Sequence, residues 1–388
     1  MTDDRSLLAT VLPALLAVGM IFLITGASLA TLPLYLHAEL GFGADVVGAV
    51  AGAQFVSAVI ARIWSGRMAD HKGPKAAMLA GLALSFAAGG FYLTSVLLKA
   101  APSTALASLV VARVLLGGAE SFIITAGQSW GLALAGQDRA GAVIGWTGTA
   151  LYVALAVGGP LGGALYAVMG FGGIAWITLV IPVLTAALIL PRPGPVPVPK
   201  TDGKGPSVLA AVARPGMAAG LAGFSYSAMA FFSVLLFLDR GWQPTWAPFS
   251  AFAVALVLMR LAFSSLPDRL GGRKTALVFL SVQILGLAGL MQGGFETVAL
   301  MASFLAGAGY AFIDPALGRE AVRAVAPERV GRALGYYSAF FDLSMGVSGL
   351  LLGQIADRVG LWAVFLAAIV ASALAAGLVG WWPKRVIT

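Results

Sequence analysis

The chain has 388 residues, of which 60% are hydrophobic and 10% are charged, and its mean hydropathy is +0.94. Because a soluble protein carries about 25% charged residues, this composition excludes a soluble globular fold and favours one whose apolar exterior is solvated by lipid. The formal net charge of +8 would be compatible with nucleic-acid binding, but the positions of the basic residues argue against a nucleic-acid partner.

Twelve apolar segments of about 20 residues are each long enough to cross a hydrocarbon core of about 30 Å. The first has no charged side chain from Ser6 to Leu36, far longer than the apolar core of about 7–15 residues in a signal peptide. We therefore expect it to remain in the membrane. The sequence predicts an all-α membrane protein with twelve transmembrane helices, at residues 8–36, 44–65, 76–98, 104–130, 142–168, 172–190, 212–238, 245–266, 275–294, 297–318, 333–355 and 361–382.

Lys and Arg are distributed unevenly over the loops between these segments. If the N-terminus lies in the cytoplasm, 18 of the 24 Lys and Arg fall in cytoplasmic segments or, for Arg214, in the first turn of a span on its cytoplasmic side. Three lie outside (Lys99, Arg240 and Arg358), and three lie deeper within spans (Arg62, Arg113 and Arg260). Since cytoplasmic loops are enriched in Lys and Arg, this bias predicts that both termini are cytoplasmic and that the basic charge reflects topology.

The loop after the second span has a recurring pattern of charge and glycine. It reads GRMADHKGPK over residues 66–75, and its notable members are Gly66, Arg67, Asp70, Gly73 and Lys75, preceded by Arg62. Glycine permits close helix approach and tight turns. Arg62 lies one to two turns inside its helix, where we favour snorkelling or a gate salt bridge over substrate contact.

The fourth span contains two ionisable residues, Arg113 and Glu120. They are seven residues apart, which places them two turns apart on the same helix face. A charge at the bilayer centre costs a few kcal/mol or more. Burial favours the neutral form of the carboxyl group and a nearby arginine favours the charged form. This combination indicates a group that loads and releases a proton, although a structural ion pair is the alternative.

The fifth span contains Gly158-Gly159-Pro160-Leu161-Gly162-Gly163, with Gly159, Pro160 and Gly163 as candidate functional positions. After the sixth span, residues 191–206 are polar and proline-rich and predict a semi-rigid cytoplasmic linker. The expected domains are a first six-helix bundle at 1–190 and a second at 207–388.

The second half repeats features of the first. Residues 327–336 match 137–146 at an offset of 190. Arg260 and Asp268, followed by Gly271 and Arg273, repeat the loop pattern after the second span at an offset of 198. Charged positions that recur in register indicate an internal duplication. Arg260, like Arg62, is expected to act in snorkelling or a gate salt bridge.

Two further carboxylates fall within spans of the second half. Asp342 lies in the middle of the eleventh span, and capping by a hydroxyl such as that of Ser344 is the structural alternative to a proton-coupling role. Asp314 precedes Pro315, and because a proline interrupts a helix and frees a carbonyl, a local backbone role competes with a functional one. Polar and aromatic side chains that could line a substrate cavity are Gln54, Gln128, Tyr152, Phe224, Tyr226, Tyr310, Tyr336 and Phe340.

These features resemble the major facilitator superfamily, whose members have six plus six spans related by a parallel repeat. The 66–75 loop is similar to the facilitator loop signature, Arg113 and Gly117 to the fourth-helix motif, and residues 158–163 to the antiporter motif. The last match departs from the pattern at Leu155 and Ala164. Residues 62–70, Gly241-Trp242 and 339–349 further resemble bacterial arabinose-efflux-permease-like exporters.

The resemblance implies two six-helix bundles related by pseudo-two-fold symmetry, enclosing a central cavity that opens alternately to each side. It implies that Asp70 latches a cytoplasmic gate, with Gly66, Arg67, Gly73 and Lys75 around it and Asp268 as its counterpart, and that Arg113 takes part in proton coupling. We expect a multi-pass monomer in the bacterial inner membrane, with a small-molecule substrate, protons and the lipid bilayer as its partners.

The leading functional hypothesis is a proton-coupled antiporter that exports a small metabolite, a sugar-like or a drug-like compound. A proton symporter or importer of a sugar or organic acid is the alternative, and a non-transporting membrane sensor is an alternative of another class. We expect no enzymatic activity, no cofactor and no metal, since the chain has no cysteine, its two histidines (His37 and His71) are distant in sequence, and no phosphate-binding Gly-x4-Gly-Lys motif is present.

Overall fold

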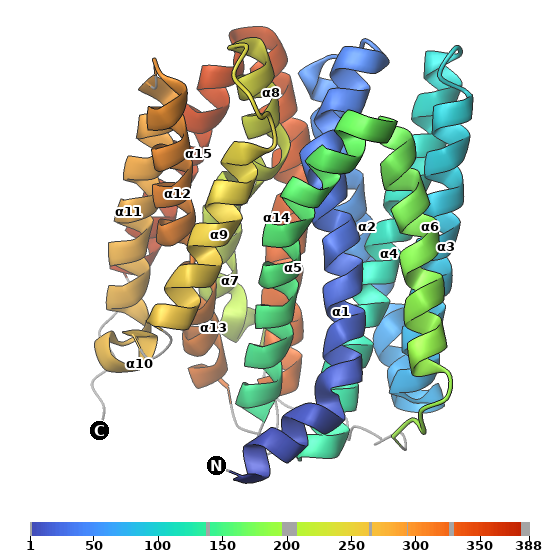
Figure 1. Ribbon diagram of the computed structural model, residues 1–388. Helices are drawn as coiled ribbons and strands as arrows, with labels where there is room; N and C mark the ends of the chain where they lie inside the picture. The colour runs from blue at the N-terminus through green and yellow to red at the C-terminus, as the bar shows by residue number, and fades with distance from the viewer. Residues whose placement is uncertain are drawn as a thin grey trace. The chain divides into compact units, whose positions relative to one another are not determined.

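A computed structural model describes residues 2–136, 140–195, 208–263, 266–292, 294–325 and 330–381. The chain divides into two compact units, Met1–Asp202 and Gly203–Thr388, and this division falls inside the predicted linker. Part of that linker and parts of the 137–146 and 327–336 repeat lie outside the described residues. Every regular element in the described ranges is helical (Figure 1).

Unit 1 consists of six long helices, the first of which ends in a π-helical turn. They are α1 (Thr2–Leu34) with η1 (Tyr35–Glu39), α2 (Ala44–Lys72), α3 (Pro74–Leu97), α4 (Pro102–Ala135), α5 (Ala140–Met169) and α6 (Phe171–Ile189). α4 packs against α2 and α3, while α1 packs against α5. Proline at the first turn of α3 and α4 starts each helix without losing a hydrogen bond.

Unit 2 also contains six membrane-crossing segments, three of which are interrupted or short. They are α7 (Val208–Ser227) with η3 (Ala228–Phe232) and α8 (Ser233–Asp239), α9 (Ala247–Ala262) followed by α10 (Leu266–Leu270), α11 (Gly272–Gln292), α12 (Glu296–Tyr310) with α13 (Ile313–Arg323), α14 (Val330–Val359) and α15 (Leu361–Gly380). α12 packs against α9 and α11, and α7 packs against α14 and α15.

All twelve predicted spans are helical, and the predicted twelve-helix fold class is confirmed. Eleven described segments are long and apolar enough to cross a membrane, and the shorter apolar helix Ala247–Ala262 is the twelfth. At 1.5 Å per residue its 16 residues extend about 24 Å, less than a hydrocarbon core of about 30 Å. The predicted span at 245–266 is therefore too long at both ends.

The internal duplication is visible in how helices cross within each unit. In unit 1, a Cβ built on Gly117 would lie 1.9 Å from the carbonyl oxygen of Gln54, so α2 and α4 approach as closely as glycine permits. In unit 2, a Cβ on Gly307 would lie 2.1 Å from the carbonyl oxygen of Phe252, where α9 meets α12. Gly307 follows Gly117 by 190 residues and Phe252 follows Gln54 by 198, the two offsets of the sequence repeat.

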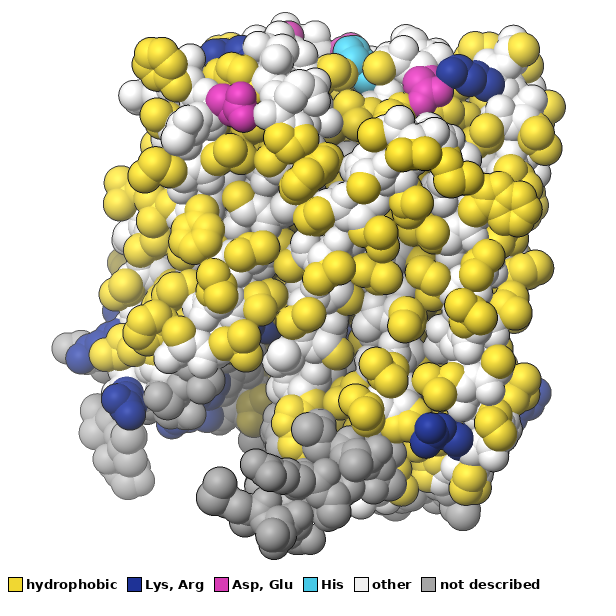
Figure 2. All heavy atoms as spheres, viewed as in Figure 1, with side chains coloured by type: hydrophobic (Ala, Val, Ile, Leu, Met, Phe, Trp, Pro, Cys, Tyr) yellow, Lys and Arg dark blue, Asp and Glu magenta, His cyan; other side chains and the backbone are white. Residues whose placement is uncertain are grey.

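The exterior of each unit is apolar along the middle of its helices. Figure 2 shows hydrophobic side chains over this part of the visible face, with Lys, Arg, Asp and Glu gathered toward the helix ends. Large exposed hydrophobic residues include Ile63, Trp64, Trp176, Leu184 and Leu285. Because a soluble surface of this kind would aggregate, it is the surface of a multi-pass membrane protein.

Candidate functional site

Two ionisable side chains lie buried in the interior of unit 1, both on α4. Arg113 is 0% exposed and Glu120 is 4% exposed. The structure thus places both predicted proton-coupling residues of the fourth span inside the helix bundle, where lipid cannot reach them. Each is held by neutral side chains from neighbouring helices, in two adjoining sets of hydrogen bonds.

The first set holds the carboxylate of Glu120. Its Oε1 atom accepts a short hydrogen bond from the hydroxyl of Thr25 on α1 and another, of 2.7 Å, from Nε2 of Gln54 on α2. Gln54 is fully buried, and its Oε1 atom has no hydrogen-bond partner among the described residues. The predicted cavity residue Gln54 is therefore a direct partner of the predicted proton carrier.

The second set holds the guanidinium of Arg113. Its Nη1 atom donates to the hydroxyl of Ser28 on α1 at 2.9 Å and to that of Tyr92 on α3 at 3.3 Å. The two hydroxyl oxygens are themselves 3.0 Å apart. The remaining nitrogens, Nε and Nη2, are buried without an acceptor in the described part of the chain.

Three residues of these sets were missed by sequence reasoning: Thr25, Ser28 and Tyr92. Thr25 and Ser28 are three residues apart on α1, so they share one helix face and lie within a turn of each other. Arg113 and Glu120, two turns apart on α4, therefore converge on one turn of α1. The spacing of two hydroxyls inside an otherwise apolar span was the available signal, but their partners depend on the register of three helices.

In unit 2 the equivalent positions hold aromatic residues instead. Phe252 corresponds to Gln54 and Tyr310 to Glu120 by the repeat offsets. The rings of Phe252 and Tyr310 have centroids 5.9 Å apart, and Tyr226 packs on both at 5.7 Å. Tyr226 and Tyr310, both predicted to line a cavity, are buried in this aromatic cluster.

Among the other predicted cavity residues, Gln128, Tyr152, Phe224 and Phe340 are half-buried and Tyr336 is 40% exposed.

The two predicted carboxylates of unit 2 occupy different surroundings. Asp342 on α14 is 7% exposed. The hydroxyl of Ser344 donates to the backbone carbonyl of Gly220, so its single proton is not available to cap Asp342. Asp314, in the first turn of α13, is half-buried; its backbone carbonyl accepts a 2.8 Å bond from the hydroxyl of Tyr337, and the charge of Arg260 acts on its carboxylate.

The predicted gate loop turns at Gly73, whose φ of +89° requires glycine, and its repeat turns at Gly271 with φ +80°. Lys75 donates through Nζ to the carbonyl oxygens of Leu190 and Arg192, each at 2.7 Å, at the C-terminal end of α6. Arg273, the repeat of Lys75, donates to the carbonyl oxygen of Gly380 at the end of α15. The basic residue of each loop therefore caps the last helix of its own unit.

The other predicted gate residues are half-buried or exposed where the structure describes them. A Cβ on Gly66 would meet no atom within 4 Å, so the close approach expected at this glycine is not made within unit 1. Arg62 and Asp70 are half-buried and Arg67 is exposed. Asp268 lies in α10, but its side chain is outside the described residues. The latch itself stays a prediction.

The glycine-rich segment of α5 packs tightly against α1. A Cβ on Gly158 would lie 2.6 Å from the carbonyl oxygen of Leu23, and one on Gly162 would lie 2.6 Å from Ala27 Cα. These glycines are four residues apart and share a face. The predicted positions Gly159 and Gly163 are each one residue further along, and Pro160 is half-buried. The close α1–α5 contact is thus made by the neighbours of the predicted glycines.

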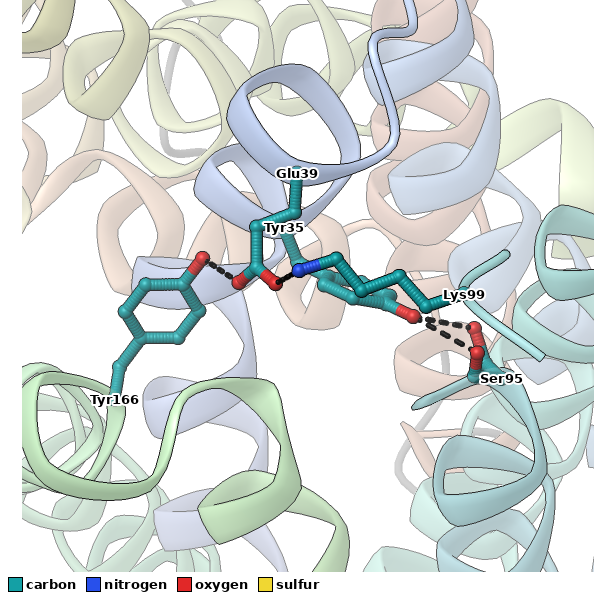
Figure 3. A network of polar contacts seen from close by, with 5 residues as sticks. All are labelled: Tyr35, Glu39, Ser95, Lys99 and Tyr166. Atoms are coloured by element: carbon teal, nitrogen blue, oxygen red, sulfur yellow. Dashed lines mark hydrogen bonds and ion pairs between the residues drawn. The ribbon is translucent and has the colours of Figure 1, made fainter. Parts of the chain in front are cut away.

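A third polar network, which the sequence reasoning missed, lies where η1 ends unit 1's first span (Figure 3). Glu39 accepts a short hydrogen bond from the hydroxyl of Tyr166 on α5 and forms a 2.5 Å ion pair with Lys99 after α3. The hydroxyl of Tyr35 donates to the backbone carbonyl oxygen of Ser95 at 3.0 Å. This network ties α1, α3 and α5 together, and the bond and charge of Glu39 raise the pKa of Lys99.

Comparison with known proteins gives a consistent family. The model of the Major Facilitator Superfamily matches residues 14–317 and, in a second match, 250–386. The MFS-type transporter STM4428 of Salmonella typhimurium is 36% identical over 358 residues, 92% of each chain. PA1993 of Pseudomonas aeruginosa is 37% identical over 354 residues (90% of this chain and 87% of the relative), and YhhS of Escherichia coli K12 is 36% identical over 350 residues (89% and 86%).

Two solved structures share the fold at low sequence identity. A point mutant of the nucleoside transporter NupG superposes with a TM-score of 0.74 at 15% identity over 96% of this chain and 99% of the other. The human organic anion transporter MFSD10 superposes with a TM-score of 0.71 at 16% identity over 95% and 98%. At these identities the likeness concerns the fold alone.

Proposed function

Because the chain belongs to the major facilitator superfamily, we propose that it is a secondary active transporter whose substrate movement is coupled to protons at Glu120. The observation that carries the proposal is the burial of this carboxylate on Thr25 and Gln54, beside the buried Arg113. A carboxylate in hydrocarbon is costly when charged. Its environment therefore controls whether it holds a proton, which is the property a coupling group needs.

Asp342 is the second candidate for proton coupling, since it is a buried carboxylate in the middle of a predicted span. Asp314 ranks below it because the interrupted helix and the charge of Arg260 give it a local structural role. Gln54 acts beside Glu120 as its hydrogen-bond donor.

The first candidate mode is export of a small molecule in exchange for protons. It is supported by the similarity of residues 158–163 to the antiporter motif and by the glycine contacts that this segment makes with α1. Proton symport of an organic acid is the second candidate, and the observation in its favour is the edge of the Arg113 guanidinium that finds no acceptor among the described residues. In this proposal the protein acts as a monomer in the inner membrane, with both termini in the cytoplasm.

The proposal is tested by substrate flux in vesicles with an imposed pH gradient, for the unaltered protein, Glu120→Gln and Asp342→Asn. Candidate substrates come from a thermal-shift screen of the purified protein. Loss of uphill flux, with substrate binding or downhill exchange retained, is expected for the coupling carboxylate. If both variants concentrate substrate at the unaltered rate, Glu120 and Asp342 are structural. The direction in which the pH gradient drives substrate flux distinguishes antiport from symport. The absence of substrate flux would favour the sensor alternative.

Topology is tested independently, because the chain has no native cysteine to interfere with labelling. A cysteine placed at Lys200 in the linker should be protected from a membrane-impermeant reagent added to intact cells and labelled in inverted vesicles. Labelling from the periplasm would reverse the orientation proposed here.

A further inference from the structure

One edge of the Arg113 guanidinium is open. Ser28 and Tyr92 both use Nη1, while Nε and Nη2 are buried and find no acceptor among the described residues. The N–H of Nε and one N–H of Nη2 point in the same direction. Together they form one of the two-pronged edges with which arginine binds a carboxylate through two parallel hydrogen bonds.

Leaving this edge open is energetically costly. A buried charge needs a counter-charge to offset a desolvation penalty of several kcal/mol, and each buried donor without an acceptor costs about 1–3 kcal/mol. The hydroxyls that hold Arg113 are neutral, and the carboxylate of Glu120 is already held by Thr25 and Gln54. An anion with two coplanar acceptor oxygens would satisfy both donors and balance the charge.

We propose that the Nε/Nη2 edge of Arg113 is a binding site for the carboxylate of a small organic acid, the transported substrate. The inference rests on the proposed transport function and names its substrate class. A carboxylate matches the edge in shape and charge. Ser28 and Tyr92 act as positioning residues, since they fix the guanidinium through Nη1 and leave the opposite edge free.

The position of Glu120 links this site to protons. Within unit 1, neutral side chains from other helices hydrogen-bond the two charged groups: Thr25 and Ser28 from α1, Gln54 from α2 and Tyr92 from α3. A charged Glu120 repels an incoming carboxylate and competes for Arg113, whereas a protonated Glu120 does neither. Substrate acid and proton therefore favour each other's binding, which is the linkage required for the symport candidate.

The experiment uses formate, the smallest carboxylate, as its probe on the purified full-length protein. Thermal unfolding is measured with sodium formate, with sodium chloride at equal ionic strength, and with formamide as the neutral counterpart. Saturating formate should raise the unfolding midpoint by about 2–4 °C over chloride, and formamide should not. Arg113→Lys keeps the charge but has no two-pronged edge, so this variant should lose the formate response.

Two further variants keep the test decisive if Arg113→Lys does not fold. Tyr92→Phe removes one hydrogen bond to Nη1 and the contact with the Ser28 hydroxyl, so it should raise the formate concentration needed for half of the effect without abolishing the response. Glu120→Gln, which mimics the protonated carboxyl group, should reach half of the formate effect at a several-fold lower concentration. Equal midpoints in formate and chloride for the unaltered protein, or an unchanged response in Arg113→Lys, would overturn the proposal. A formate response seen in Glu120→Gln alone would instead assign the edge to the Glu120 carboxylate.

This outcome is separable from that of the proposed function. The formate response is a binding measurement, and it needs neither a known substrate nor flux. A formate response that depends on Arg113, together with uphill flux that survives Glu120→Gln, would retain the carboxylate site and reject Glu120 as the coupling group. Loss of coupling in Glu120→Gln without a formate response would do the reverse.

Discussion

Arg260 donates through Nε to the carbonyl oxygen of Ala311 at 3.0 Å, at the break between α12 and α13. In a continuous helix this carbonyl would accept from the N–H of residue 315, but Pro315 has none. The arginine predicted to snorkel or to form a gate salt bridge thus supplies the hydrogen bond that the proline removes.

This relationship predicts that Arg260 and Pro315 are energetically coupled. Arg260→Met should destabilise the protein by about 1–2 kcal/mol because it leaves the Ala311 carbonyl without a donor. In a Pro315→Ala background the alanine N–H can serve that carbonyl, so the same substitution should cost measurably less. Thermal unfolding of the four combinations gives the coupling. Equal losses in both backgrounds would show that Arg260 stabilises the protein by another route.

Lys75 is predicted to stabilise unit 1 through the end of α6. Lys75→Gln removes the charge that meets the Leu190 and Arg192 carbonyls, and a loss of about 1 kcal/mol is expected. Lys72→Gln is the matched control, because Lys72 is an exposed lysine three residues earlier. Thermal unfolding should separate the two variants, and similar midpoints would argue against a capping role.

The two helix crossings should be equally intolerant of a methyl group. Gly117→Ala and Gly307→Ala each place a Cβ within about 2 Å of a backbone carbonyl oxygen, and such overpacking typically costs about 1–3 kcal/mol or more. Gly118→Ala, whose Cβ would first meet a Leu84 side-chain atom at 3.5 Å, is the control. Yield of folded protein and unfolding midpoint provide the readout, and a tolerated Gly117→Ala would contradict the packing described.

The Lys99–Glu39 ion pair predicts a pH dependence at the end of α3. Because Glu39 raises the pKa of Lys99 above its ordinary value of 10.5, the pair stabilises the fold at lower pH and the contribution is lost as pH rises through the folded pKa. The unfolding midpoint of Lys99→Gln should lie a degree or two below that of the unaltered protein from about pH 6 to about pH 9. The difference should shrink above about pH 10.5, and a difference that grows there would contradict this sign.

The gate prediction concerns transport and not stability. Asp70→Asn should leave the fold intact and slow flux, because it removes a charge expected to act in one of the alternating states. Asp268→Asn should have a smaller effect, since the second copy of the loop has Ser264 at the position of Gly66. Flux and unfolding midpoint are measured for both variants, and negligible slowing in each would remove the latch role.

The membrane spans could be predicted from sequence because a hydrocarbon core imposes a minimum length of apolar chain. The internal breaks could not. The π-helical turns at Tyr35–Glu39 and Ala228–Phe232 and the interruption after Tyr310 lie inside apolar stretches, where hydropathy is insensitive to how each N–H is bonded. Pro315 was the visible signal for the third.

The candidate site was predicted in its charged members and missed in its neutral ones. Arg113 and Glu120 are conspicuous because charged side chains are rare in spans. Gln54 stands out because a polar amide side chain is also costly there. Thr25, Ser28 and Tyr92 are ordinary residues of membrane helices. Their role follows from the rotation of α1 and α3 about their axes, which the close glycine contacts with α5 and α6 help to set. That rotation is a property of packing that local sequence does not encode.

The capping of α6 by Lys75 has a consequence for synthesis. Lys75 lies in the first turn of the third helix, α3. Its acceptors are the carbonyl groups of Leu190 and Arg192, which are among the last residues of the first half to leave the ribosome. The contact can form only after the sixth helix has entered the membrane, and it requires nothing from the second half. Since domains of a nascent chain generally fold in order, the first half can close on itself while the second is still being translated, and Arg273 repeats the step at Gly380 near the chain's end.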